Sequence, residues 1–247
     1  TILEHAPEHR ILPMIKAEAY GHGMEWVVTQ ILKIKGAQKR LSGFGVASLD
    51  EARSIRRFLE VELGVRKSRE LGISVFSGTL PWSEGCGEFC SSLGLTPVLS
   101  SLKDWRAFLK GRWYERTSFE LKFNTGMNRL GISIFELQAV KKDLIQLSRK
   151  GFAPRAICSH LASAEHPETK MSKQSRILFE SLVNELSSVL PRSVEFSIAN
   201  SAATFLAQDW RLSAITQRVR PGLALYGVPP EGMTLAHDEL IPVLTLD

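Results

Sequence analysis

Lys16 stands where a lysine can do covalent chemistry, at the point where an apolar run gives way to a glycine-containing turn. Residues 11–15 form the run, which predicts a strand, and Gly21 and Gly23 follow in the turn. Burial at a strand end disfavours the charged form of a lysine. Such an amine is a good nucleophile that forms Schiff bases with carbonyl compounds. The structural alternative is a lysine whose stem is buried and whose ammonium reaches solvent.

Two further predicted strands end in basic side chains or a histidine. Residues 121–131, LKFNTGMNRLG, place Lys122 and Arg129 around the end of one strand, and residues 159–165, SHLASAE, place His160 at the end of another. Taken alone, Lys122 and Arg129 read equally well as surface charges, and a lone histidine as a hydrogen-bonded core residue. Their shared position at strand ends favours a site.

The last two stretches fit a phosphate group. In residues 199–204, ANSAAT, Ser201 falls in the first turn of a short helix, where a hydroxyl and free backbone N–H groups bind phosphate. A plain N-cap uses the same geometry. In residues 218–227, RVRPGLALYG, Gly222 permits close approach of the backbone to a phosphate, with the Leu223 N–H as a further donor.

Strand and helix patterns alternate along the chain, and these elements must bring the five stretches together. The predicted strands are residues 11–15, 43–48, 73–78, 95–99, 117–123, 156–160, 194–198 and 219–226. Capping boxes that begin at Ser48 and Ser133 predict the starts of two of the helices between them. The longest predicted helix covers residues 170–190, with Ile177 among its inward-facing residues.

About eight strand–helix units predict an α/β protein with a closed (β/α)₈ TIM-type barrel. The active site of such a barrel lies at the carboxyl ends of its strands, where Lys16, Lys122 and His160 are expected to meet. A doubly wound sheet is the alternative, but its Gly-x-Gly-x-x-Gly turn follows none of the predicted strands.

Together, the five stretches resemble the motifs of alanine racemases and occur in that family's order. Residues 16–23, KAEAYGHG, are similar to the KAxAYGHG motif, whose lysine holds pyridoxal 5'-phosphate (PLP). Glu18 stands where the family commonly has Asn. The resemblance implies a fold-type III, alanine racemase-like PLP-binding barrel, with Lys16 linked to the cofactor and Tyr20 hydrogen-bonded to its phosphate.

Residues 121–131 resemble the family's LKxDTGMxRxG stretch. The resemblance implies that Lys122 is carbamylated and holds Arg129, which contacts the cofactor's phenolic oxygen and the substrate. Asn124 replaces the usual Asp, which leaves the orientation of this loop open. The resemblance places His160 against the pyridine ring and Arg220 at the pyridine nitrogen. The other expected cofactor-binding residues are Ser201, Gly222 and Leu223, whose types and positions suit the phosphate, and Asn200, which supports the loop by hydrogen bonding.

The implied reaction is the interconversion of L-alanine and D-alanine by proton exchange at the α-carbon. Arg220 matches the arginine that faces the pyridine nitrogen, and a permanent positive charge there discourages protonation of that nitrogen. Two bases on opposite faces racemise most directly. The resemblance gives one face to Lys16 and the other to a tyrosine from the second domain of the partner in a homodimer, with Arg129, His160 and Arg220 also catalytic. The product would supply D-alanine for cell-wall peptidoglycan.

The predicted domain division is a PLP-binding barrel over residues 1–228 and a different segment over residues 229–247. Pro229 and Pro230 indicate a linker, and residues 241–247, IPVLTLD, predict the first strand of a C-terminal β domain that the sequence lacks. The resemblance also leads us to expect that most of the family's N-terminal segment is missing from this sequence. We therefore expect these residues alone to bind PLP weakly and to racemise poorly.

Composition excludes several other classes. Of the 247 residues, 44% are hydrophobic and 23% charged, typical of an ordinary globular core. The net charge of +5 is scattered without interleaved aromatics, which argues against a nucleic-acid groove. Cys86, Cys90 and Cys158 show neither disulfide nor metal-ligand spacing and fit a reducing, cytoplasmic location. No apolar run is long enough for a membrane span.

Three alternatives stay open. The first is a racemase of broader amino-acid specificity on the same fold. The second is a non-catalytic PLP-binding barrel protein, which the residues 121–131 and 218–227 disfavour. The third is a basic nucleic-acid-binding module, which has only the net charge in its favour, and salt-dependent binding would test it.

Overall fold

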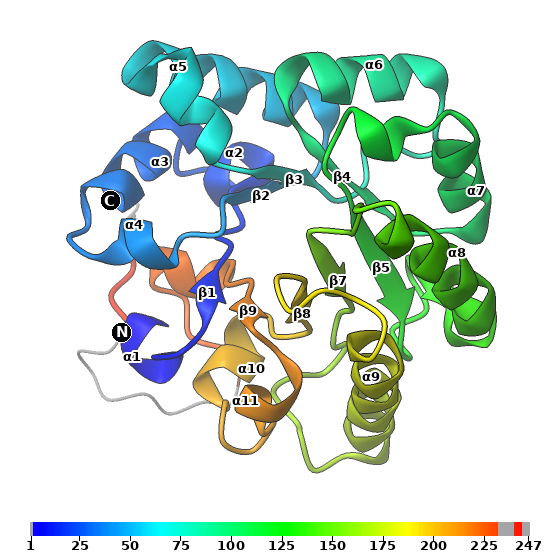
Figure 1. The fold of residues 1–247 in the computed structure, drawn as a ribbon. Helices are drawn as coiled ribbons and strands as arrows, with labels where there is room; N and C mark the ends of the chain where they lie inside the picture. Colours follow the sequence, from blue (N-terminus) through cyan, green and yellow to red (C-terminus); the bar gives the residue numbers. More distant parts are fainter. Residues whose placement is uncertain (1, 232–239, 244–247) are drawn as a thin grey trace.

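The computed structural model describes residues 2–231 and 240–243, which fold around parallel strands (Figure 1). The strands are β1 Arg10–Ile11, β2 Phe44–Val46, β3 Ile73–Val75, β4 Thr96–Leu99, β5 Glu120–Asn124, β6 Ile132–Ser133, β7 Ala156–Cys158, β8 Glu195–Ser197 and β9 Arg218–Val219. Six of them form a parallel path in the order β2-β3-β4-β5-β7-β8, and β1 pairs in parallel with β9. Short β6 pairs with β5 outside that path.

Backbone hydrogen bonds join these two sheets into a ring. Between β1 and β2, parallel bridges link Ile11 to Leu41 and Met14 to Gly45. Between β8 and β9, the Gln217 N–H donates to the Phe196 carbonyl at 2.9 Å. In the described part of the chain, all strands except β6 therefore form a closed parallel barrel, which confirms the predicted (β/α)₈ architecture.

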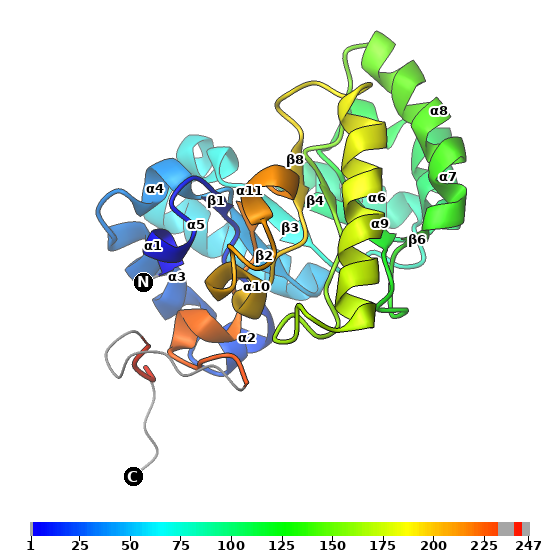
Figure 2. The same cartoon turned by 90° about the horizontal axis from the view of Figure 1, so that it is seen from below.

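Helices surround the ring on its outer side (Figures 1 and 2). The α-helices are α1 Ile2–His5, α2 Lys16–Tyr20, α3 Met24–Lys33, α4 Ala37–Arg40, α5 Leu49–Glu70, α6 Glu84–Leu93, α7 Leu102–Lys110, α8 Leu137–Arg149, α9 Lys170–Ser187, α10 Ser201–Phe205 and α11 Leu212–Ile215. Three 3₁₀ turns complete the described elements: η1 Trp113–Glu115, η2 Ile134–Glu136 and η3 Leu223–Tyr226. No helix of the described residues is long and apolar enough to cross a membrane.

Local sequence signals account for many helix starts. Both predicted capping boxes form, at Ser48 before α5 and at Ser133 before η2, which leads into α8. The prediction for Ile177 in α9 was wrong, because this side chain is 56% exposed. The buried face of α9 passes instead through Phe179 and Leu182, whose spacing continues a helical stripe that Ile177 does not share.

Two strand predictions near the end of the chain need correction or lie beyond the structure. The predicted strand 219–226 is short, because β9 ends at Val219 and η3 follows Pro221 and Gly222. Pro221 lacks the N–H that a continuing ladder requires. Of the predicted strand 241–247, residues 241–243 form no strand and the rest lies outside the described residues. The domain division at residue 228 stays a prediction.

A charged cluster lies inside the barrel near the amino ends of the strands. The fully buried side chains of Glu120 and Arg218 form a bidentate pair, with Nη1–Oε1 at 2.9 Å and Nη2–Oε2 at 2.6 Å. Ser74 donates to Glu120 at 2.7 Å, and Glu195 approaches Arg218 at 3.5 Å. Since these residues begin or line strands on several sides of the ring, the cluster links the strands through the core.

Candidate active site

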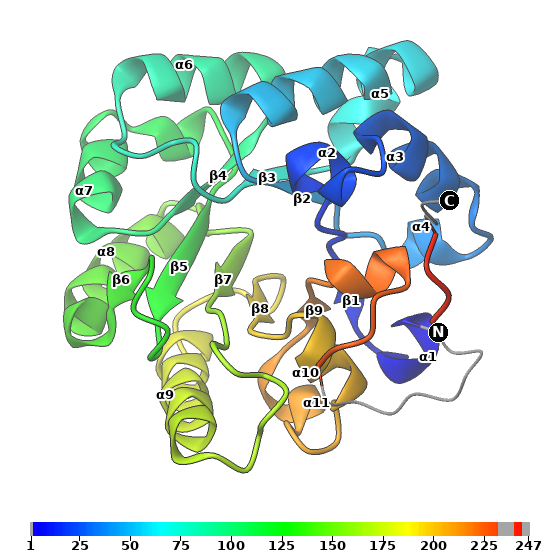
Figure 3. The same cartoon turned by 180° about the vertical axis from the view of Figure 1, so that it is seen from behind.

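One cavity of about 690 Å³ opens at the carboxyl ends of the barrel strands. In Figure 3 the turn α2, which follows β1, and the segment after β9 both lie on this side of the ring. All ten predicted site residues line the cavity: Lys16, Tyr20, Lys122, Arg129, His160, Asn200, Ser201, Arg220, Gly222 and Leu223. The barrel thus gathers five stretches that lie far apart in the sequence.

Lys16 begins a turn of unusual hand. The next four residues, Ala17 to Tyr20, all have positive φ, between 50° and 57°. A left-handed conformation costs roughly 1–2 kcal/mol for each residue that has a Cβ. Backbone bonds from Gly21 to the carbonyls of Ala17 and Glu18 close the turn at 3.0 Å. This turn holds the Lys16 Nζ 5.6 Å from the centre of the Tyr20 ring.

Glu18, the residue that differs from the usual Asn, contacts the start of the next helix. Its Oε2 accepts the Met24 N–H at 3.3 Å, and Gly23, the N-cap of α3, supplies no side-chain cap. A carboxylate at a helix N-terminus satisfies a free donor and interacts favourably with the helix dipole. Glu18 thereby ties the end of the left-handed turn to α3.

Ser201 and Gly222 are hydrogen-bonded neighbours in the lining of the cavity. The Ser201 Oγ accepts the Gly222 N–H at 2.9 Å and the Ala224 N–H at 3.3 Å. Asn200, and not Ser201, is the N-cap of α10, because its side chain accepts the Ala203 N–H at 3.1 Å. The Ser201 hydroxyl is therefore not used for capping and lies beside two backbone donors.

Arg220 is almost fully buried at the centre of the cavity wall. Its Nη1 donates to the Ser197 carbonyl at 2.8 Å and to the Ser197 hydroxyl, and its Nη2 donates to the Ser159 carbonyl. Burial lowers the pKa of Arg220. The guanidinium carbon also lies 6.0 Å from the centre of the Phe76 ring. These acceptors on the ends of β7 and β8 fix the guanidinium in one orientation.

The amine of Lys122 is buried among other positive groups. Burial lowers its pKa, and the charges of Arg220 and Arg129 lower it further. The loop that carries Arg129 is ordered by Asn124, whose Oδ1 accepts the N–H groups of Gly126 at 3.0 Å and Asn128 at 3.1 Å. An Asp oxygen would accept the same two bonds, so the Asn found here preserves an acceptor that orders the loop.

His160 follows β7 by two residues and is half-buried in the cavity lining. Burial, together with the positive charges of Arg220 and Lys122, lowers its pKa to about 3. The imidazole is therefore neutral at pH 7, when it can pack against a planar ring without adding a further charge to the cavity.

Replacing His160 should make the cofactor-free protein less sensitive to acid. A histidine whose folded pKa lies near 3 binds its proton only in the unfolded state between about pH 6.5 and pH 3, so stability falls as the pH drops through this window. At pH 5 the loss reaches up to about 2 kcal/mol, less what solvent screens. Urea unfolding of wild type and His160→Gln at pH 7 and pH 5 measures it. An unchanged pH dependence in His160→Gln would contradict this account.

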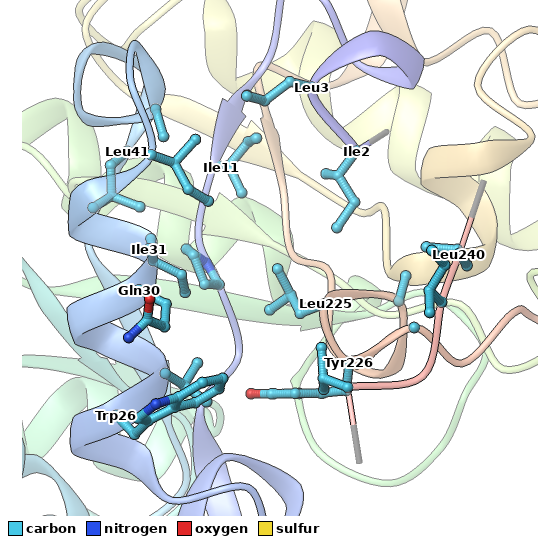
Figure 4. A pocket seen from close by; sticks show the side chains of 18 residues that line it. Ile2, Leu3, Ile11, Trp26, Gln30, Ile31, Leu41, Leu225, Tyr226 and Leu240 are labelled. Atoms are coloured by element: carbon cyan, nitrogen blue, oxygen red, sulfur yellow. The ribbon is translucent and has the colours of Figure 1, made fainter. Parts of the chain in front are cut away.

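A second cavity, of about 410 Å³, lies on the outer side of β1 (Figure 4). It is lined almost entirely by apolar side chains, among them Ile11, Ile31 and Leu225, with Trp26 and Tyr226 at one edge. The Tyr226 hydroxyl is occupied by a 3.0 Å bond to the Met14 carbonyl. Tyr226 is the only titratable residue among the described residues that line this second cavity, so it lacks the basic and nucleophilic side chains of the first cavity.

Several residues of the first cavity were not predicted. Phe76 follows β3 and faces Arg220, and Glu165 lines the opening. The position of Phe76 at a strand end was the available signal, since the carboxyl ends of barrel strands supply site residues. No cluster of three or more histidine, cysteine or acidic side chains suited to a metal occurs among residues 2–231 and 240–243.

Comparisons with known proteins agree with this geometry. The family model described as alanine racemase, N-terminal domain, matches residues 1–230. The alanine racemase of Legionella pneumophila (strain Corby) is 34% identical over 249 residues, which cover 97% of this chain and 59% of the relative. That of Brucella abortus (strain 2308) is 30% identical over 251 residues, which cover 96% of this chain and 56% of the relative. The chain thus spans less than two thirds of the length of these relatives.

Solved structures give the same result. Alanine racemase from Bartonella henselae, with covalently bound pyridoxal phosphate, matches with a TM-score of 0.73 at 26% identity. The match covers 94% of this chain and 60% of the Bartonella chain. The biosynthetic alanine racemase from Pseudomonas aeruginosa matches with a TM-score of 0.75 at 27% identity, and this match covers 98% of this chain and 60% of the Pseudomonas chain. With a matching family model over nearly its whole length and relatives of the same fold, the chain belongs to the alanine racemase N-terminal domain family.

Proposed function

We propose that this chain is the cofactor-binding barrel of a PLP-dependent alanine racemase. The observation that carries the proposal is the convergence of ten residues from five distant stretches on one cavity, each matching a position in the family's motifs. Surface lysines and core histidines would have no reason to meet in this way. The relatives' names identify alanine as the substrate to test.

The chemistry of the cavity suits an anionic cofactor with a phosphate. Four basic side chains line it against two carboxylates; the basic residues are Lys16, Lys122, Arg129 and Arg220, and the acidic ones are Glu165 and Glu231. The Ser201 hydroxyl accepts the N–H groups of Gly222 and Ala224, which leaves its own proton for a phosphate contact. Gly222 keeps the backbone open to a phosphate, and the Tyr20 hydroxyl lies beside it. Asn200 holds the start of α10, and the Leu223 N–H is a further proposed donor.

In this mechanism PLP, once bound, withdraws electrons from the substrate and weakens its Cα–H bond. Lys16 holds the cofactor and then moves a proton at one face of the α-carbon. Arg220 keeps a positive charge at the pyridine nitrogen, which suits proton exchange better than deeper carbanion chemistry. Neutral His160 would pack against the pyridine ring of the cofactor. Arg129 would contact the cofactor's phenolic oxygen and orient the substrate.

The opposite face needs a second base. Tyr20 is assigned to the phosphate, and no other tyrosine lines the cavity among the described residues. We therefore propose that a tyrosine from the C-terminal domain of a partner subunit supplies it, as the family resemblance implies, so that the active species is a homodimer.

Lys122 is the proposed site of carbamylation. Carbamate forms when a neutral amine adds to CO₂ and releases a proton. Burial lowers the pKa of Lys122 and so favours the neutral amine that this step requires. The negative carbamate would lie among Arg129, Arg220 and Lys16 and so relieve the repulsion between these groups.

The proposed domain division remains at residue 228, and the proposed role is D-alanine supply for peptidoglycan in the cytoplasm. The three free cysteines of the described residues support that location.

Turnover assays test the proposal. The homodimer that includes the proposed C-terminal domain, supplied with PLP, should convert either enantiomer of alanine into an equal mixture of the two, because enantiomers have the same free energy. Parallel assays with serine, lysine and arginine measure the substrate breadth. Absence of turnover for every amino acid, with PLP bound, would favour a non-catalytic PLP barrel instead.

Filling the space above Gly222 should weaken PLP binding. A Cβ at this position would lie 2.5 Å from the Tyr20 Oη, so Gly222→Ala must displace the phenol from the phosphate contact. We expect a loss of about tenfold or more in PLP affinity, or roughly 1.4 kcal/mol. In a Tyr20→Phe background the same substitution should cost clearly less, because the clashing oxygen is gone. Fluorescence titration with PLP measures both, and additive costs would contradict the contact.

A further inference from the structure

The turn that carries Lys16 has an external support in Glu51. The Oε1 of Glu51 accepts the Ala17 N–H at 2.7 Å. Its Oε2 accepts the N–H groups of Ala47 at 2.7 Å and Ser48 at 3.1 Å. One carboxylate therefore binds three backbone donors, from the residue after Lys16 and from the end of β2.

These contacts go beyond what a helix cap requires. In the capping box of α5, Glu51 needs only to accept the Ser48 N–H while the Ser48 hydroxyl accepts the Glu51 N–H, at 3.2 Å. The Ala17 bond lies 34 residues away in sequence and serves no element of α5. Hydrogen bonds to an ionised carboxylate are among the stronger ones in proteins.

The position of Ala17 makes this bond matter for Lys16. The Ala17 N–H belongs to the peptide group that immediately follows Lys16, so fixing it fixes the plane through which the Lys16 side chain is oriented. Ala17 also begins the run of four left-handed residues, which persist only when the surroundings hold them. Ala47, the second residue held by Glu51, itself lines the cavity.

We propose that Glu51 is a positioning residue for Lys16: its carboxylate ties the left-handed turn to the end of β2 and keeps the Lys16 amine in the cavity. The inference rests on the proposed role of Lys16 in holding PLP. Glu51 is not among the described residues that line the cavity, and it acts through the backbone N–H groups that it accepts.

Two variants separate positioning from capping. Glu51→Ala removes the carboxylate from both roles, whereas Ser48→Ala weakens the same capping box and leaves the Ala17 bond intact. Glu51→Gln keeps one acceptor oxygen and serves if Glu51→Ala fails to fold. Amide hydrogen exchange of the cofactor-free protein is the first readout, followed over residues 16–20 and over the first turn of α5.

We expect exchange over residues 16–20 to quicken by roughly tenfold or more in Glu51→Ala, to quicken less in Glu51→Gln, and to stay unchanged in Ser48→Ala. The rate at which borohydride traps PLP on Lys16 should fall in the same order. Equal effects of Glu51→Ala and Ser48→Ala on residues 16–20, or no effect of Glu51→Ala, would overturn the proposal. If wild type takes up no PLP on Lys16, the proposed function fails, while the exchange data still decide whether Glu51 holds the turn.

Discussion

Lys16→Ala should lower racemase turnover by at least about 10³-fold, because it removes both the group that holds PLP and the base at one face of the substrate. The fold should survive, since Lys16 is only partly buried and makes no hydrogen bond on which a strand depends. Turnover of L-alanine and D-alanine by the homodimer that includes the proposed C-terminal domain, with saturating PLP, measures the first outcome, and a thermal melt measures the second.

The matched control for this substitution is Lys103→Ala. Lys103 is an exposed residue of α7 and is not among the described residues that line the cavity, so its loss should leave turnover within about twofold of wild type. A Lys16→Ala protein that keeps more than a tenth of wild-type turnover would contradict the proposed role of the amine.

Glu120→Gln should give the largest loss of stability, about 3 kcal/mol of unfolding free energy. Burial opposes ionisation of Glu120, but the charge and hydrogen bonds of Arg218 and a bond from Ser74 hold its pKa below the usual value. Removing one partner of a buried pair leaves the other charge uncompensated, which typically costs 3–5 kcal/mol. We expect a cost at the lower end of this range, because the carboxylate of Glu195, 3.5 Å from Arg218, still compensates part of the arginine's charge.

The same pair predicts sensitivity to acid. Since the folded pKa of Glu120 is depressed, its contribution is present above the unfolded pKa near 4.3 and is lost as pH falls through the folded value. Glu185→Gln is the control, because Glu185 pairs with Lys141 at the surface, where solvent screens the pair, and its loss should cost clearly less than that of Glu120. Urea unfolding of both variants at pH 7 tests the comparison; equal losses would show that burial does not set the cost.

Much of the barrel was predictable because its signals are local. The Ser48 and Ser133 capping boxes depend on residues three positions apart, and both form. The alternation of strands and helices with right-handed crossovers leaves few possible topologies, so the closed barrel could be predicted from the order of the elements. Ile177 shows the limit of this method: an apolar residue in a helix does not reveal its face when the stripe is interrupted by serines such as Ser172 and Ser175, which are buried.

The positions of the site residues could be predicted, but their contacts could not. Strand ends identify where Ser201 and Arg220 lie along the chain, whereas the bonds of Ser201 to Gly222 and Ala224 arise only when β8 and β9 are neighbours. The left-handed turn after Lys16 has no local signal, since alanine and glutamate rarely adopt positive φ. The tertiary bond from Glu51, far along the sequence, is part of what holds it.

Asn200 and Glu18 show how departures from expectation have physical reasons. Asn200, and not Ser201, is the N-cap of α10, which leaves the serine hydroxyl for the cavity. Glu18, unusual at its position, accepts the N–H of Met24 at the start of α3. Neither contact follows from residue type alone, because several acceptors compete for each donor.

The central claim is that Lys16 holds PLP, and the most direct measurement is to locate the attached cofactor. The protein is incubated with PLP, reduced with borohydride, digested, and analysed by mass spectrometry. We expect a phosphopyridoxyl group on the peptide that contains Lys16, with no such group in Lys16→Ala. A modification found instead on Lys122 or on surface lysines, or no modification at all, would contradict the claim.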